Sequence, residues 1–269
     1  MHTGILKKMG FDYENGATTI APRYHLDLNE EKIGMNDLIG QIIHLFHTGK
    51  IICSSCGKTT KKSYGQGYCY PCFISVPQTE ECVLKPELCR AHEGIARDMV
   101  FAKENCLVDQ YVYLALSGGL KVGVTRYHQI PTRWVDQGAV FAIKVAITPN
   151  RYNAGLVEVE LKKTFADKTN WRKMLMGNDE LEDLVANKRK AIETIIGKGF
   201  QFSVADDSVY TINYPVKDFP LKVNSISFDK QAEIIGTLLG IKGQYLIFDG
   251  GRVLNIRTHN GYEVFINIL

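Results

Sequence analysis

Short runs of apolar residues interrupted by polar ones occur near the start of the chain. Residues 24–28 read YHLDL and residues 42–46 read IIHLF, a pattern typical of strands that bury one face. The pairs Asn15-Gly16 and Thr48-Gly49 are typical of tight turns between strands. The pattern therefore predicts a small β-rich segment over residues 1–52.

The end of the chain has a similar pattern. Its strand-like runs are residues 245–248, 253–257 and 262–268. Asp249-Gly250-Gly251 and Asn260-Gly261 are the predicted hairpin turns between these runs. We expect residues 201–269 to be β-rich and to pair with residues 1–52 in one barrel or sandwich.

In the middle of the chain, predicted strands alternate with predicted helices. The runs 111–116 and 120–125 flank Ser117-Gly118-Gly119 and predict a hairpin. A short helix is expected over residues 132–137, stopped by Gly138, and a third strand over residues 140–148.

Two further helices are predicted after this strand. Ala154, Val157, Leu161 and Phe165 recur at spacings of three and four residues, which marks one apolar helical face. Residues 178–196 predict a charged helix that ends at Gly197. Residues 109–200 are therefore expected to form a three-stranded α/β module, and the whole chain an α+β fold.

Composition excludes several classes of protein. The formal net charge of +3, from 32 Lys and Arg against 29 Asp and Glu, is too small to indicate nucleic-acid binding by itself, so any basic surface must be local. No apolar run approaches the roughly 18 residues of a membrane span, and the first residues lack the apolar core of a signal peptide. We expect a cytoplasmic protein with no membrane partner.

Cysteines are concentrated in residues 53–108, which predicts a metal-binding module. The pairs Cys53-x2-Cys56 and Cys69-x2-Cys72 are separated by twelve residues. Each pair can direct two thiolates at one ion, so the two pairs complete a tetrahedral zinc site with no open position for catalysis. The alternatives are a redox Cys-x-x-Cys motif and ordinary buried thiols. We expect a structural zinc ion here.

A second zinc ion has a looser set of candidate ligands. They are Cys82, Cys89, His92 and Cys106. Only Cys89 and His92 are closely spaced, so unliganded cysteines and a surface histidine are the alternative.

Basic and aromatic residues share the loop between the first two cysteine pairs. They are Lys58, Lys61, Lys62, Tyr64 and Tyr68. Lysines can pair with phosphates and tyrosines can stack on bases, so this loop is a candidate nucleic-acid contact; a solvated surface is the alternative.

The α/β module resembles the GIY-YIG nuclease family over residues 111 to about 175. Tyr113 matches the tyrosine of the first motif of that family, and Gly123 matches the glycine of the second motif. Arg133 matches the arginine on the first helix, for which Arg126 is the alternative. Glu158 matches the glutamate that binds the metal ion. Such a set, taken residue by residue, is also compatible with core packing and a structural ion pair.

The GIY-YIG resemblance implies a phosphodiesterase that uses Mg²⁺ or Mn²⁺. Glu158 would hold the metal ion, Arg133 would stabilise the phosphorane, and Tyr113 would orient or activate water. Lys121 stands where the second motif of the family has its tyrosine, and a lysine acts as a base only with a strongly lowered pKa. Lys121 and Arg126 can also hold a phosphate backbone without cutting it.

The whole chain also resembles a bacterial family known as domain of unknown function 2797. The strings that carry this resemblance are Cys53-x2-Cys56, Gly67 to Cys72, Lys85 to Cys89, Lys121 to Arg126, Arg133 to Ala139 and Gly240 to Tyr245. That family name implies an architecture and no activity.

Two classes of function follow from these patterns. The first is a zinc-containing protein that binds DNA or RNA, either as a metal-dependent nuclease or as a degenerate binder. The second is a non-enzymatic adaptor that docks on a ribosomal, polymerase or other protein assembly through the cysteine-rich loop and a predicted exposed turn at Gly240–Tyr245.

Overall fold

The chain folds into two compact units with an α+β composition. The computed structural model describes residues 2–14, 16, 18–29, 31–179 and 182–269, with 27% helix and 35% strand. The first unit comprises Met1–Ile74 and Asn213–Leu269, and the second comprises Ser75–Ile212. The boundary after Ile74 divides the cysteine-rich segment 53–108, so that each unit contains one of its cysteine groups.

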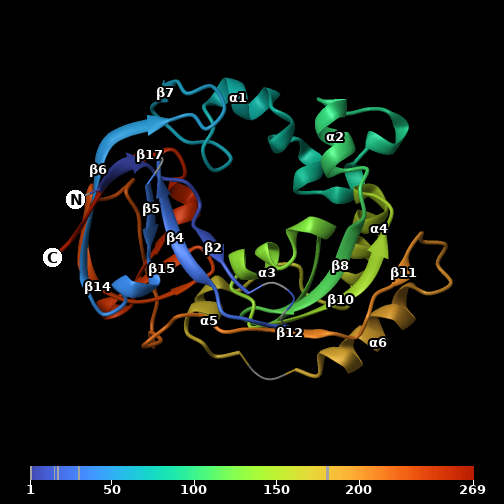
Figure 1. Cartoon of the computed structure of the whole chain (residues 1–269). Coiled ribbons are helices and arrows are strands. Elements are labelled where there is room, and N and C mark those ends of the chain that lie inside the picture. The colour runs from blue at the N-terminus through green and yellow to red at the C-terminus, as the bar shows by residue number, and fades with distance from the viewer. Residues whose placement is uncertain (1, 15, 17, 30, 180–181) are drawn as a thin grey trace. The chain divides into compact units, whose positions relative to one another are not determined.

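Strands from both ends of the chain share the main sheet of the first unit (Figure 1). Its order is β1 (His2–Ile5), β17 (Tyr262–Ile268), β6 (Ile42–Ile52), β14 (Glu233–Lys242), β15 (Tyr245–Phe248), β16 (Arg252–Asn255) and β13 (Asn224–Ile226), and β7 (Thr59–Thr60) also pairs with β6. All these neighbours are antiparallel except β13 and β16, which are parallel. Alternate residues of β6 and β14 are buried, as expected for a sheet with one covered face.

The remaining elements of the first unit are short. A three-stranded sheet contains β2 (Gly10–Asp12), β4 (Arg23–Leu28) and β5 (Glu31–Gly34), and β3 (Thr19–Ile20) precedes β4. Single 3₁₀ turns occupy Asn36–Leu38, Asp249–Gly251 and Ile256–His259, and α1 (Tyr70–Ser75) ends at the unit boundary.

Two predicted turns of the first unit are wrong. β6 continues through Thr48-Gly49, and Gly49 adopts a φ of +87° where the register against β17 shifts. A glycine with positive φ marks a bulge there because the strand keeps pairing on both sides. Asn260-Gly261 is not a hairpin turn, because β17 pairs with β1 and β6 and not with β16. Asn15 lies outside the described residues.

The second unit contains the predicted strand and helix order. Its sheet runs β12 (Val209–Ile212), β10 (Phe141–Thr148), β8 (Gln110–Leu116) and β9 (Leu120–Arg126), with β11 (Ser203–Val204) also on β10. Its helices are α2 (Met99–Asn105), α3 (Thr132–Asp136), α4 (Arg151–Leu161), α5 (Trp171–Leu175) and α6 (Leu184–Ile195), and 3₁₀ turns occupy Pro77–Thr79, Glu81–Val83, Pro86–Leu88, Ala91–Glu93 and Tyr127–Gln129. The predicted hairpin, short helix, third strand and following helix are therefore confirmed, whereas the charged helix begins later than predicted, at Leu184.

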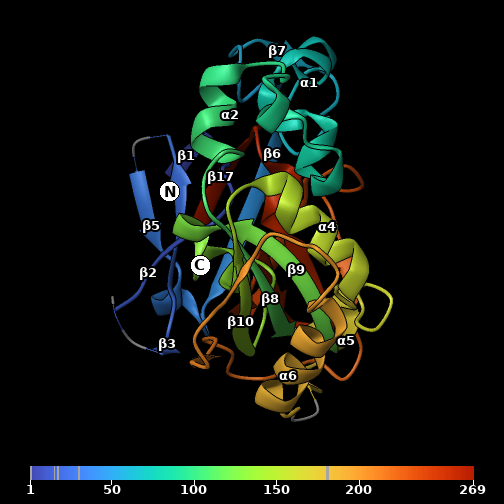
Figure 2. The same cartoon turned by 90° about the vertical axis from the view of Figure 1, so that its right-hand side faces the viewer.

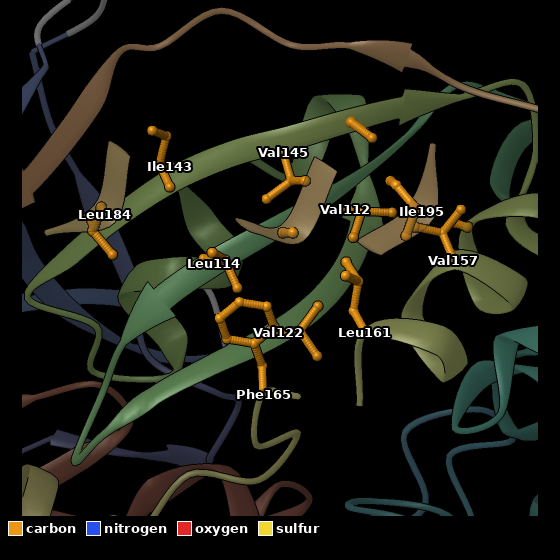
Figure 3. Close-up of a cluster of buried hydrophobic side chains, with 13 residues drawn as sticks. Val112, Leu114, Val122, Ile143, Val145, Val157, Leu161, Phe165, Leu184 and Ile195 are labelled. Carbon is orange, nitrogen blue, oxygen red and sulfur yellow. The ribbon is translucent and has the colours of Figure 1, made fainter. Parts of the chain in front are cut away.

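The core of the second unit lies between this sheet and two helices (Figures 2 and 3). Val112, Leu114 and Val122 come from the β8–β9 hairpin and face Leu161 of α4 and Ile195 of α6. Burial of each such side chain contributes about 1.5–3 kcal/mol. The hairpin and α4 are thereby held in fixed positions, and they bear Tyr113, Lys121 and Glu158.

None of the helices in the described part of the chain is long and apolar enough to cross a membrane.

Candidate functional site

Four cysteines of the first unit form one candidate metal site. The Sγ atoms of Cys53, Cys56, Cys69 and Cys72 all lie within 4.8 Å of one another, and Cys56 Sγ lies 3.8 Å from Cys69 Sγ. A zinc–sulfur distance of about 2.3 Å gives tetrahedral S···S edges of about 3.8 Å, whereas a disulfide requires about 2.05 Å. The donor set and its spacing fit a zinc ion.

Local backbone geometry prepares the first cysteine pair for a metal. Cys53 follows β6, and Gly57 N donates to Cys53 O at 2.9 Å, which closes a tight turn in which Gly57 has a φ of +69°. Burial raises the pKa of the Cys53 thiol, but backbone N–H groups of Cys56, Cys69 and Ser55 act against burial and lower that pKa to about 6. The thiolate form that binds metal is thus favoured.

Three cysteines form a second group in the other unit. Cys82, Cys89 and Cys106 are buried, and their Sγ atoms lie within 4.8 Å of one another. Among the described residues His92 is not part of this group; its ring stacks on Tyr152 with centroids 4.3 Å apart. The Cys89-x2-His92 spacing made His92 a candidate ligand, whereas the described structure groups the three cysteines without it. Three thiols are suitable zinc ligands.

The second cysteine group is hydrogen-bonded to helix α4 and packs against it. Arg151, the first residue of α4, donates from Nη1 to Cys82 O at 3.3 Å, and its backbone N donates to Cys106 O at 2.8 Å. Further along the helix, a Cβ atom on Gly155 would lie 2.1 Å from Glu87 N, so the segment between Cys82 and Cys89 rests directly on the helix backbone. Any distortion of this cysteine group therefore acts on α4.

The candidate nucleic-acid loop is exposed only in part. Lys58, Lys61 and Lys62 are exposed, whereas Tyr64 and Tyr68 are half-buried. Lys62 Nζ lies 5.3 Å from the centroid of the Tyr64 ring. The lysines are accessible to an anion, and the tyrosines contribute mainly to packing of the loop.

Four of the five predicted catalytic residues line one cavity of the second unit. Tyr113 on β8, Lys121 on β9, Arg133 on α3 and Glu158 on α4 surround a space of about 80 Å³, and Asp167 lines it as well. We call this space the Tyr113 cavity. These side chains come from four different elements, so the fold and not the local sequence brings them together.

Burial sets the electrostatics of the Tyr113 cavity. Tyr113 donates from its hydroxyl to Gln137 Oε1 at 3.1 Å, and burial raises the pKa of its phenol. Burial, with the nearby Arg133 charge, lowers the pKa of the Lys121 amine from 10.5 to about 8. Burial also raises the pKa of the Glu158 carboxyl, although Lys162 opposes this shift.

Lys162 lies between the two carboxylates of the Tyr113 cavity. Its Nζ atom is 3.4 Å from Glu158 Oε2 and 3.7 Å from Asp167 Oδ2. The Lys162 side chain is 29% exposed. The ammonium group occupies the position from which a cation would interact with both acids.

Arg126, the fifth predicted catalytic residue, lies in a neighbouring cavity. It lines a space of about 130 Å³ together with Arg133 and Arg151. We call this space the arginine cavity. Arg133 lines both cavities, which makes them neighbours.

Sequence patterns missed several residues of these cavities. Asp167 follows α4 in an irregular segment, Arg151 belongs to no motif, and Gln137 lies in the Arg133-to-Ala139 string but was given no role there. Burial was also misjudged at Gly240–Tyr245, which was predicted to be an exposed docking turn. Ile241 and Lys242 are 0% exposed, and a Cβ atom on Gly240 would lie 2.7 Å from Val216 Cα. Close packing of β14 therefore removes this turn from the accessible surface.

Comparison with known proteins gives a family but no activity. No curated protein and no solved structure matches the chain. The family model described as protein of unknown function DUF2797 matches residues 40–264, which include both cysteine groups and both cavities. The chain belongs to the DUF2797 family.

Proposed function

We propose that the second unit is a GIY-YIG-like module that binds the phosphodiester backbone of a nucleic acid in the Tyr113 cavity and hydrolyses it with a divalent metal ion. The observation that carries this proposal is the convergence of Tyr113, Lys121, Arg133 and Glu158 on one cavity. A phenol, an amine, a guanidinium and a carboxylate can together orient water, accept a proton, stabilise phosphate charge and hold a metal ion.

Arg133 is suited to the phosphate charge. Its Nε atom is buried and has no hydrogen-bond partner, and among the residues that the structure describes it forms no ion pair with a carboxylate. An unpaired buried donor is costly unless a ligand satisfies it. Because a guanidinium matches phosphate oxygens in bidentate geometry, a phosphodiester is an appropriate partner for Arg133.

Lys121 is suited to the role of general base. A buried tyrosine at this position would stay protonated at neutral pH and could not accept a proton, as the raised pKa of Tyr113 illustrates. A lysine with a pKa of about 8 is partly neutral at neutral pH and can accept a proton from the attacking water. Water oxygen bonds to phosphorus, the bond to the leaving oxygen breaks, and solvent protonates the leaving oxygen. Tyr113, held by Gln137, orients the water.

The carboxylates of the Tyr113 cavity fit a Mg²⁺ or Mn²⁺ ion. Both ions prefer oxygen ligands, and Mg²⁺ is commonly held by one or two carboxylates together with waters and substrate phosphate. Glu158 and Asp167 offer such a pair once Lys162 withdraws. The bound ion would stabilise negative charge on the phosphate.

We also propose that the cysteine groups hold structural zinc, one ion in each unit. The four-thiolate group leaves no open coordination position, which is unsuitable for catalysis. The second group lies against α4, the helix that bears Glu158, so its zinc would stabilise the wall of the Tyr113 cavity. The exposed lysines Lys58, Lys61 and Lys62 would add non-specific phosphate contacts.

The experiment that tests this proposal is cleavage and binding of single-stranded, duplex and branched DNA and RNA with Mg²⁺ or Mn²⁺. The protein is compared with Glu158→Gln, which removes the metal-binding charge at constant shape, and with Glu193→Gln, an exposed residue of α6, as the matched control. We expect metal-dependent cutting that Glu158→Gln abolishes and Glu193→Gln retains. If every variant binds nucleic acid and none cuts it, the second unit recognises the backbone without hydrolysing it. If no variant binds, the proposed function is refuted.

A further inference from the structure

Three guanidinium groups converge on the arginine cavity from three different elements. Arg126 ends β9, Arg133 lies on α3, and Arg151 begins α4. The remaining lining residues are apolar or uncharged: Val83, Pro86, Gln110, Val124, Thr125 and Gln129. The lining of this cavity therefore contains no carboxylate to balance the three positive charges.

The positive charges of the three guanidinium groups in the arginine cavity repel one another. Burial lowers the pKa of the Arg126 guanidinium, and the charges of Arg151 and Arg133 lower it further. Among the described residues, Arg126 forms no ion pair with a carboxylate. An arrangement of this kind is costly by itself and becomes favourable when an anion binds within it.

Arg151 is fixed in place by protein carbonyl groups. Its Nη1 atom donates to Cys82 O at 3.3 Å and its Nη2 atom donates to Asn105 O at 3.2 Å. A guanidinium has five N–H donors, so donors remain for a ligand after these two bonds. Arg151 is thus held in position before any anion arrives, which lowers the entropic cost of binding.

The position of the arginine cavity indicates which anion it binds. It shares Val83, Pro86, Val124 and Arg133 with the Tyr113 cavity, so Arg133 lies between the two spaces. We propose that the arginine cavity binds a second phosphate group of the same nucleic-acid strand, beside the phosphate in the Tyr113 cavity. This inference rests on the proposed function and adds a strand-positioning subsite formed by Arg126 and Arg151.

The test measures binding of a fluorescent single-stranded oligonucleotide by anisotropy over a range of salt concentrations, with the full chain. Arg126→Gln removes one guanidinium that makes no ion pair in the described structure. Arg126→Lys keeps the positive charge but loses the planar guanidinium that can donate two parallel hydrogen bonds to a phosphate. Arg189→Gln, at an exposed position of α6, is the matched control for the lost charge. Zinc content and thermal unfolding are recorded for each variant to confirm that it folds.

We expect Arg126→Gln to bind about tenfold more weakly and to reduce the slope of log K against log salt by about one. Arg126→Lys should keep most of the slope while losing affinity, and Arg189→Gln should match the unmodified protein. If the protein binds the oligonucleotide and Arg126→Gln matches it in both affinity and slope, the subsite is refuted while the proposed function stands. If the protein itself does not bind, the proposed function fails and the subsite with it.

Inorganic phosphate separates a strand subsite from a site for free phosphate. We expect millimolar phosphate to compete weakly with the oligonucleotide, because it engages one cavity at a time. Thermal stabilisation of the protein by phosphate that is lost in Arg126→Gln, together with an absence of oligonucleotide binding, would assign the cavity to free phosphate and overturn the strand model.

Discussion

Gly123 lies directly opposite Tyr113 in the β8–β9 pair, and the missing side chain provides the space that the phenol ring fills. A Cβ atom on Gly123 would lie 2.6 Å from Tyr113 Oη and 2.7 Å from its Cζ. The absence of a side chain at Gly123 therefore determines where the Tyr113 ring lies.

The Gly123→Ala change should expel the Tyr113 ring from its position. Overpacking of this kind costs about 1–3 kcal/mol of unfolding free energy. In a Tyr113→Leu background the same change should cost less, because the opposing ring atoms are gone. Urea unfolding of the four proteins in this cycle provides the measurement. Equal costs in both backgrounds would show that Gly123 does not act through Tyr113.

The two cysteine groups should hold zinc independently. Cys56→Ser removes a ligand from the first group and Cys106→Ser from the second, so each variant should lose one zinc ion per chain and retain the other. Elemental analysis of the purified variants measures this. Loss of both ions from either single variant would contradict one site in each unit.

Gly155→Ala should disturb the second cysteine group from a distance in sequence. The added methyl group would overlap Glu87 N and Pro86 C, at 2.1 and 2.4 Å, and push the Cys82–Cys89 segment away from α4. We expect loss of the second zinc ion and a lower unfolding temperature. Val159→Ala, at a position on the same helix that is 41% exposed, is the control and should retain both ions.

Lys162→Met should raise the affinity of the Tyr113 cavity for Mn²⁺. The lysine ammonium lies 3.4 Å from Glu158 and 3.7 Å from Asp167, and its removal frees both carboxylates for a divalent ion. Calorimetric titration with Mn²⁺ measures the change, which should be at least about tenfold if one charge–charge contact of this kind is lost. Affinity that is unchanged or lower would show that these carboxylates are not the ligands.

The stability of the protein should depend on the protonation of Lys121. Its amine faces Arg133, Glu158 and Asp167, and its pKa falls from 10.5 to about 8 on folding. The charged form is therefore destabilising below pH 8, and this cost disappears as pH rises toward 10.5, because the folded chain releases the proton before the unfolded chain does. Lys121→Met should be more stable than the unmodified protein at neutral pH, and the difference should shrink toward pH 10.5. A difference in urea midpoint that does not vary with pH would contradict the lowered pKa.

Local patterns predicted the parts of the structure that depend on neighbours in sequence. The x2 spacing of Cys53 and Cys56 specifies a tight turn that bears two cysteines, and the runs on both sides of Ser117-Gly118-Gly119 specify a hairpin. The ordered set of Tyr113, Arg133 and Glu158 was found through the family resemblance, and these side chains share one cavity.

Features that depend on distant partners were not visible in the sequence. Gly49 sits in a bulge because β17 pairs on both sides of it, and Gly240 is buried because Val216 packs against it. His92 stacks on Tyr152 and does not join the cysteine group. Each of these outcomes is decided by contacts between segments far apart in the chain, which periodicity and spacing do not encode.

The most direct measurement of the central claim is the affinity of the protein and of Arg133→Gln for a labelled oligonucleotide. Arg133 lines both cavities, so its loss should weaken binding by more than the combined loss of the exposed lysines Lys58, Lys61 and Lys62. We predict a reduction of at least about tenfold for Arg133→Gln. Unchanged affinity in Arg133→Gln, with binding lost in the triple lysine variant, would locate nucleic-acid recognition in the first unit and contradict a phosphate site in the second.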